Sequence, residues 1–381
     1  MNRVCAVCLV ISLLLIIPHW PVHAQLNDQR PADRPATEIT KDKQLFFGIN
    51  TLSAIRNTEY FGPIIQGHTL LSHQIHPYLR FYPAEHLRVD LGVFTRRDWA
   101  DIRFFSGAEP TLSFKYQHRG FLLLLGNMEA GNQHRLIAPL YNEAWMLLRA
   151  PVPGLQLQYT QGLTFVDVWL AWLTLLRQQD SIPEELAAGI SFAQGLIQSQ
   201  QFNLELPIQG MLYHLGGQGI PTKDYSLFSG AIGIKLGMQV NGYKLLKGLC
   251  LESYYVASRY IKEVARPFRY GQGFYGSLTC KTAWVAIVGS YWYGHGFSTE
   301  NIGSPLYQSM AILNKQVKYQ AKVRELFLLR LLYEYQLADG VTLGLHLDPY
   351  YDFGNNLLEH AEGLYISYRP CFKLTKSKLL D

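Results

Sequence analysis

The chain has 381 residues and a formal net charge of +5, and 48% of its residues are hydrophobic whereas only 17% are charged. This net charge is mild and no basic run concentrates it, which argues against a nucleic-acid-binding protein. No segment after residue 24 contains the roughly 18 uncharged apolar residues of a membrane-spanning helix, which excludes a helical membrane protein.

The N-terminus has the three parts of a secretory signal peptide. Arg3 supplies a positive charge, residues 4–17 form an apolar run, and Val-His-Ala at residues 22–24 fits a cleavage site. An uncleaved anchor helix is disfavoured because the apolar run is too short to span a bilayer. We therefore predict a cleaved signal peptide over residues 1–24 and a flexible periplasmic lead-in over residues 25–42, which is polar and contains two prolines.

From residue 43 onward, apolar and polar residues alternate in short segments, a pattern that indicates β-strands with a different environment on each face. Strands of about 9–11 residues have the length needed for a tilted membrane crossing. The sixteen segments, in chain order, cover residues 44–52, 72–82, 86–97, 111–117, 121–128, 145–159, 165–176, 187–197, 202–215, 229–240, 245–257, 273–280, 283–293, 323–336, 341–351 and 364–374.

The connections between these segments also alternate in length. They are short after even-numbered strands and long after most odd-numbered ones, as in outer-membrane barrels with short periplasmic turns and long external loops. A soluble β-sandwich or propeller is disfavoured because no repeated blade or periodic motif is present. We predict an all-β fold, a transmembrane antiparallel β-barrel of about sixteen strands (roughly 14–18), over residues 43–374, followed by a C-terminal tail over residues 375–381.

The stretch HLRVDLGVFTRR (86–97) shows how the two faces of a strand are used. Leu87, Val89 and Leu91 share the parity that faces lipid, whereas Arg88 and Asp90 share the parity that faces an aqueous lumen. The same parity predicts these pore-lining residues: Arg80, Arg88, Asp90, Lys115, Asp167, Glu205, Lys235, Glu252, Arg330, Glu334, Asp348 and Arg369. Six are basic and six are acidic, which predicts weak selectivity or local sites of paired charges. The simpler interpretation is that these acidic and basic side chains pair with one another on the water-facing inner wall and have no functional role.

The segment HGFSTEN (295–301) contains His295, Ser298 and Asn301, which are residue types of a serine lipase. No nucleophile elbow accompanies them, so an ordinary polar loop is the alternative. The histidines show no metal-ligand spacing and no glycine-rich phosphate loop follows a strand, so we expect no metal and no cofactor. Three cysteines follow the signal peptide, and a Cys250–Cys280 disulfide is left open.

Two aromatic stretches, residues 57–64 and 98–105, belong to long connections on the external side. Three roles fit such loops: folding inward as a constriction, packing together as a lid, and binding a surface partner. Packing of the aromatic residues on one another over the mouth is the plainest of these expectations.

Three stretches resemble porin-like outer-membrane β-barrel proteins of Bacteroidetes, a largely uncharacterised group: NTEYFGPI (57–64), HRLIAPLYN (134–142) and FVDVWLAW (165–172). The resemblance runs from about residue 43 to the end of the chain and implies fold and location rather than a cargo. One departure is that Phe372 is followed by KLTKSKLLD, whereas such barrels commonly end with an aromatic residue. The usual C-terminal assembly signal is therefore not evident.

The sequence thus predicts an exported protein of the cell outer membrane that is not an enzyme. Its expected function is the passive or weakly selective diffusion of small hydrophilic solutes, with outer-membrane lipid as its other partner and no nucleic acid. A homo-oligomer is compatible with a barrel of this size, although no feature demonstrates one. The alternatives are a plugged structural or secretion-associated barrel, a barrel lipid hydrolase, and a transporter of apolar solutes.

Overall fold

The computed structural model describes residues 43–129, 131–149, 151–175, 182–217, 224–240, 242–261, 266–311 and 319–376. The predicted signal peptide, the predicted lead-in and the last five residues lie outside these ranges. Within the described ranges, no helix is both long and apolar enough to cross a bilayer.

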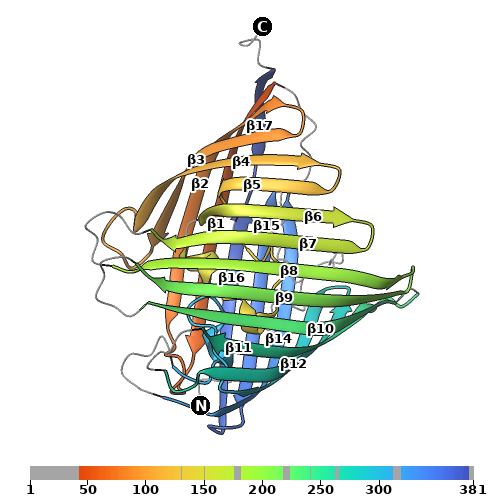
Figure 1. Cartoon of the computed structure of the whole chain (residues 1–381). Coiled ribbons are helices and arrows are strands. Elements are labelled where there is room, and N and C mark those ends of the chain that lie inside the picture. Colours follow the sequence, from red (N-terminus) through yellow and green to blue (C-terminus); the bar gives the residue numbers. More distant parts are fainter. Residues whose placement is uncertain are drawn as a thin grey trace, which may run out of the picture.

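The described chain forms a single antiparallel sheet whose strands follow one another in sequence order (Figure 1). Each segment of alternating residues thereby obtains a hydrogen-bonded neighbour that runs in the opposite direction. The strands are β1 (Gln44–Glu59), β2 (Thr69–Ala84), β3 (Leu87–Asp98), β4 (Gly107–His118), β5 (Phe121–Asn127), β6 (Pro153–Gln161), β7 (Thr164–Thr174), β8 (Glu184–Gln198), β9 (Phe202–Gly216), β10 (Tyr225–Gln239), β11 (Leu246–Tyr260), β12 (Tyr270–Thr282), β13 (Val285–His295), β14 (Val323–Ala338), β15 (Val341–Asp352), β16 (Leu357–Tyr368) and β17 (Cys371–Lys376).

The strand β1 closes this sheet into a barrel by pairing with the last segments of the chain. From Thr51 to Glu59 it pairs with β16, and from Gln44 to Gly48 it pairs with β17. These two segments are successive parts of one strand position, interrupted at Pro370, which has no N–H to donate to the ladder. The 17 strands therefore occupy sixteen positions, which confirms the predicted barrel. Closure leaves no unpaired edge, as lipid requires.

One predicted strand begins later than expected. The alternation predicts a strand over residues 145–159, but β6 begins only at Pro153. The residues before it form the short helix α2 (Ala144–Leu148). The prolines at positions 151 and 153 explain the difference, because a proline cannot donate a hydrogen bond to a central ladder.

Side chains alternate between the outer and the inner surface of the barrel, as the parity predicts. On β3, Leu91 is 56% exposed whereas Arg88 is 2% exposed. On β10, Ile232 and Ile234 are exposed on the outer surface, whereas Ser229 is buried inside. The outer surface therefore presents apolar side chains to lipid, where Lys or Arg would cost about 2–4 kcal/mol at the midplane.

The hydrophobic core lies inside the barrel, between the wall and two long connections that fold inward. The connection between β5 and β6 contains the 3-10 helix η2 (Ala138–Leu140), and the connection between β13 and β14 contains η3 (Pro305–Tyr307). Trp292 of the wall is fully buried against the second of these connections, with its ring centroid 5.1 Å from that of Phe297 and 5.6 Å from that of Tyr307. These connections therefore narrow the lumen.

The Cys250–Cys280 disulfide that the sequence left open does not form, because the two thiols are free and lie on opposite faces of the wall. In the ladder, Cys250 is opposite Thr279, and Cys280 is opposite Leu249. Residues that are opposite each other share a face, and adjacent residues in a strand do not. Cys250 therefore faces the lumen, where it is buried, while Cys280 faces outward.

Candidate functional site

On the inner wall near the short turns, predicted pore-lining charges of β2, β3 and β4 form one connected group. Arg80 donates two hydrogen bonds to the Asp90 carboxylate, at 2.8 and 3.0 Å. Arg88 contacts Asp90 at 3.1 Å and Glu129 at 2.8 Å, and Lys115 Nζ lies 3.6 Å from Glu129. The register explains the grouping, because Arg80 is opposite Asp90 and Arg88 is opposite Lys115.

Glu129 lies in the connection after β5, outside the strands, and sequence reasoning missed it. Burial raises the pKa of its carboxyl, but the charges of Lys115 and Arg88 and a hydrogen bond from Arg88 lower it further, to about 2. The carboxylate therefore stays ionised and tethers the start of this connection to the inner wall.

We expect this tether to be lost in acid. Because folding lowers the pKa of Glu129 from 4.5 to about 2, its stabilising contribution is complete above pH 4.5 and disappears as the pH falls toward 2. Urea unfolding in phospholipid vesicles, followed by tryptophan fluorescence between about pH 5 and pH 2.5, measures this loss. Glu129→Gln should lower the free energy of unfolding near pH 5 and make its dependence on pH shallower. A profile as steep as that of the unmodified protein would contradict the assignment.

A second group surrounds Lys235 on β10. Its Nζ lies 2.6 Å from the Glu252 carboxylate on β11. In the ladder, Lys235 is opposite Glu252 on one side and opposite Glu205 of β9 on the other. Ser277 on β12 donates a hydrogen bond to Glu252 at 3.4 Å. This side of the lumen therefore presents a paired set rather than a lone positive charge.

Asp167 on β7 holds the β5–β6 connection against the wall. It is 0% exposed, accepts hydrogen bonds from Gln156 at 3.1 Å, and lies 2.8 Å from His134 Nδ1. The His134 ring stacks on Trp169 with centroids 4.4 Å apart. The structure thus places Asp167 at a docking point of the connection rather than on open lumen surface.

Arg330 on β14 joins the wall to the same connection. It pairs with Asp348 on β15 at 2.9 Å and also with Glu143, which precedes α2. His346 Nδ1 lies 3.1 Å from the Asp348 carboxylate. Two of the predicted residues are therefore brought together by adjacent strands, and a loop carboxylate completes the group.

The two remaining predicted residues lie toward the short turns. Glu334 on β14 accepts a hydrogen bond from the hydroxyl of Tyr365. Arg369 follows β16, and its backbone N–H donates to the Gly340 carbonyl at 3.0 Å. Neither residue belongs to the lining of the internal cavity.

That cavity has a volume of about 460 Å³ and lies between the inner wall and the inward-folded connections. This volume falls within the roughly 300–1,000 Å³ of sites that hold small molecules. The charged side chains of its lining are Arg56, Arg149, Arg330, Glu143, Glu300 and Asp348. With arginines and carboxylates in equal number, the cavity suits a small polar solute without favouring one sign of charge.

Among the predicted pore-lining residues, only Arg330 and Asp348 reach this cavity. Arg56 could have been found by parity, because β1 continues to Glu59 although the predicted strand stops earlier. Glu143 belongs to a connection without periodicity, so alternation carries no information about it.

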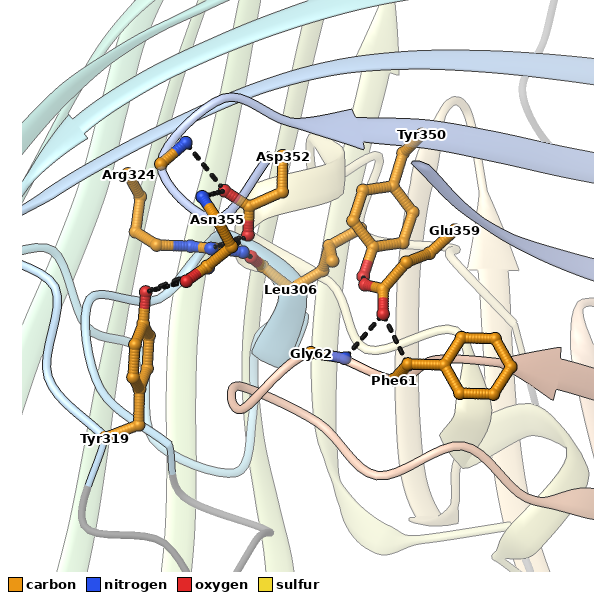
Figure 2. Close-up of polar contacts among 10 residues, drawn as sticks. Phe61, Gly62, Leu306, Tyr319, Arg324, Tyr350, Asp352, Asn355 and Glu359 are labelled. Carbon is orange, nitrogen blue, oxygen red and sulfur yellow. Dashed lines mark hydrogen bonds and ion pairs between the residues drawn. The ribbon is translucent and has the colours of Figure 1, made fainter. Parts of the chain in front are cut away.

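A buried carboxylate fastens the β1–β2 connection to the wall (Figure 2). Glu359 on β16 accepts hydrogen bonds from the backbone N–H groups of Phe61 and Gly62, the second at 2.5 Å, and from the hydroxyl of Tyr350. Glu359 is 2% exposed, so these hydrogen bonds take the place of those that its carboxylate would otherwise accept from water. We call this group the Glu359 latch.

A buried ion pair fastens the β13–β14 connection in the same region (Figure 2). Arg324 on β14 pairs with Asp352 on β15 and donates to the Leu306 carbonyl at 3.0 Å. Asn355 donates to Asp352 at 2.7 Å and to the hydroxyl of Tyr319 at 2.9 Å. We call this group the Arg324 latch.

The two aromatic external stretches differ in where their side chains lie. In residues 57–64, Ile64 is 2% exposed and belongs to the core, whereas Phe61 is 71% exposed. In residues 98–105, Ile102 is 101% exposed and Phe104 is 69% exposed. Only the first stretch therefore contributes to a constriction, and the plainest expectation for the pair, packing together over the mouth, is wrong.

The lipase-like segment does not assemble a serine–histidine pair. Ser298 is 2% exposed, and its hydroxyl lies 3.1 Å from Gln308 Oε1 and 3.3 Å from the Tyr260 hydroxyl. His295 ends β13 on the parity of the outward-facing Tyr293. Within the described part of the chain, no hydrogen bond joins His295 to Ser298. The structure therefore does not bring His295 and Ser298 into contact.

A family described as "Lipid A 3'-O-deacylase-type" matches residues 36–377. No protein of curated function matches the sequence. Among solved structures, the outer membrane protein OprD from Pseudomonas aeruginosa is similar with a TM-score of 0.52 and 7% identity, over 88% of this chain and 97% of OprD. Acinetobacter baumannii OccAB4 matches with a TM-score of 0.49 and 11% identity, over 87% of this chain and 99% of OccAB4. The likeness to OprD confirms the porin-like barrel as a fold.

Proposed function

We propose that this chain, which belongs to the Lipid A 3'-O-deacylase-type family, is an outer-membrane channel for passive or weakly selective diffusion of small hydrophilic solutes. The observation that carries this proposal is the charged inner wall, together with an internal cavity of about 460 Å³ lined by both signs of charge. A transporter of apolar solutes is disfavoured because its lumen would be apolar.

Two features of the lumen determine the conductance that we expect. Arg80, Arg88 and Arg330 each contact a carboxylate, so these arginines of the described wall do not form a one-sided positive ring that would select anions. The inward-folded connections occupy part of a lumen that sixteen strand positions would otherwise leave wide. We therefore expect a small conductance with little preference between cations and anions.

The test is the single-channel conductance of the refolded full-length protein in a planar bilayer under a salt gradient. Folding is checked first by the heat-dependent migration of the barrel in gel electrophoresis. We expect small, steady steps and a reversal potential near zero. A folded barrel that gives no steps would contradict the channel and would instead indicate a plugged structural or secretion-associated barrel.

The description of the family favours a second function, the hydrolysis of an acyl ester of a lipid such as lipid A. An enzyme of this kind needs its nucleophile on the outer surface, because acyl chains lie in the bilayer and not in the lumen. The buried Ser298 does not meet this requirement. The test is the release of fatty acid from vesicles that contain lipid A, measured by mass spectrometry. No release by the folded barrel would remove this function.

A further inference from the structure

The outer surface of the barrel carries a serine and a histidine in direct contact. Ser53 Oγ on β1 lies 2.5 Å from His73 Nδ1 on β2. The two residues are opposite each other in the antiparallel ladder, so the register itself holds their side chains together. An imidazole that accepts through Nδ1 carries its proton on Nε2 and is able to take the proton of the hydroxyl.

Parity places this pair on the lipid side of the wall. Ile55, on the parity of Ser53, is 45% exposed, and Leu79, on the parity of His73, is 44% exposed. By contrast, Ser72 is 1% exposed and faces inward. Polar side chains avoid hydrocarbon unless they are hydrogen-bonded, and Ser53 and His73 meet this condition through each other.

The pair belongs to a polar region toward the long loops. Arg97 on β3 is exposed and lies opposite His73 in the ladder. Further toward the loops, Asn57 donates to Glu362 at 2.9 Å, and Glu362 contacts His360 at 2.7 Å. We define the outer polar patch as these residues: Ser53, Asn57, His73, Arg97, His360 and Glu362. Ser53 and His73 lie one outward position inside the row of Ile55 and Leu364, beyond which the polar Asn57, His360 and Glu362 end the apolar belt on this side. The ester bonds of outer-leaflet lipids lie near such a boundary, between headgroups and acyl chains.

The connection between β3 and β4 gives this patch an apolar neighbour. Trp99, Ile102 and Phe104 are 61%, 101% and 69% exposed. The Arg97 guanidinium carbon lies 5.3 Å from the centroid of the Phe104 ring. Exposed aromatic and aliphatic side chains beside an arginine are typical of segments that rest in the membrane interface. Lipid is therefore the molecule that meets this surface.

We propose that Ser53 and His73 are the nucleophile and the general base of a lipid acyl-ester hydrolase site on the outer surface of β1 and β2. The inference rests on the second function proposed above and names the residues that would perform it. The substrate class is a carboxylic ester of an outer-leaflet lipid, and Arg97 supplies the positive charge that the oxyanion needs.

The chemistry proceeds in two balanced halves. His73 takes the proton of the Ser53 hydroxyl as Oγ bonds to the ester carbonyl carbon, and Arg97 faces the oxyanion that forms. The bond to the lipid alcohol then breaks, His73 gives its proton to the departing oxygen, and the acyl group stays on Ser53. Water from the headgroup region next gives a proton to His73 and its hydroxyl to the acyl carbon. The fatty acid leaves, and Ser53 recovers its proton from His73.

The experiment measures fatty-acid release from vesicles containing lipid A, and in parallel the labelling of the full-length protein by a fluorophosphonate, located by peptide mass spectrometry. Ser53→Ala and His73→Gln should each lower the rate of release by about 100- to 10,000-fold, the usual contribution of such groups. The fluorophosphonate should label Ser53 in the unmodified protein and fail to label it in His73→Gln. Ser72→Ala is the matched control, because this neighbouring serine faces the lumen, and it should leave the rate unchanged.

The results of this experiment distinguish a failure of the Ser53–His73 site from a failure of the hydrolase function. Release that persists in a folded Ser53→Ala barrel would overturn the site and leave the hydrolase function standing. No release from the folded unmodified protein would overturn both. Labelling decides the case if a substitution prevents folding, because it needs only the unmodified chain. A probe that reacts elsewhere, or nowhere, would show that Ser53 and His73 merely satisfy each other's hydrogen bonds.

Discussion

Arg324→Ala will lower the free energy of unfolding by about 3–5 kcal/mol, because it leaves a buried carboxylate without its counter-charge. Arg324 is 1% exposed and its partner Asp352 is 2% exposed. The guanidinium also satisfies the Leu306 carbonyl at 3.0 Å, so the substitution removes a bond to the β13–β14 connection as well. Urea unfolding in phospholipid vesicles, followed by tryptophan fluorescence, measures the loss.

Two comparisons make this prediction specific. The double variant Arg324→Met, Asp352→Asn should recover part of the stability, because it removes the second charge and keeps an amide oxygen for the N–H groups of Gly354 and Asn355. Arg103→Ala breaks an ion pair with Asp101 that is exposed on the β3–β4 connection, and it should leave the unfolding midpoint unchanged. Equal effects of Arg324→Ala and Arg103→Ala would show that the Arg324 latch contributes no more than a surface pair.

Glu359→Ala will increase the single-channel conductance severalfold. The substitution removes the acceptor for the backbone N–H groups of Phe61 and Gly62 and for the hydroxyl of Tyr350. The β1–β2 connection then loses its attachment to β16, and solvent at the mouth of the barrel is the only remaining partner for these two N–H groups. A connection that moves away from the lumen widens the path for ions.

The planar-bilayer measurement used for the unmodified protein serves this variant as well. Glu85→Gln is its control, because this carboxylate is exposed in the short turn between β2 and β3 and should not change the step size. Steps of unchanged size in a folded Glu359→Ala barrel would show that the β1–β2 connection lies outside the conduction path. The channel would then have to be limited by the β5–β6 or the β13–β14 connection.

The two proposed functions use opposite surfaces of the barrel, so their tests do not interfere. Substitutions at Ser53 and His73 change side chains on the lipid side and leave the ion pairs of the lumen intact. The carboxylate of the Glu359 latch lies inside the barrel, where Glu359 is 2% exposed. Conductance and fatty-acid release should therefore respond to different sets of variants.

The sequence alone predicted the barrel, about sixteen strands and the two faces on which their residues alternate. The physical reason is that a membrane-spanning strand obeys a local rule: residues of one parity meet lipid and residues of the other parity face the interior, as Leu91 and Arg88 do. Periodicity of this kind is readable without knowing which strands are neighbours. The export signal over residues 1–24 stays a prediction, because those residues lie outside the described chain.

Only the tertiary structure decided how the long connections fold and which charges meet. Glu143 joins Arg330 across 187 positions of sequence, and Asp167 holds a loop histidine, contacts that no local pattern encodes. The contact between Ser53 and His73 likewise depends on the register of β1 and β2, since a slip of one residue would send one of them to the lumen. Alternation therefore determines which face a residue occupies, while its partners on that face depend on the register and on loops whose packing is non-local.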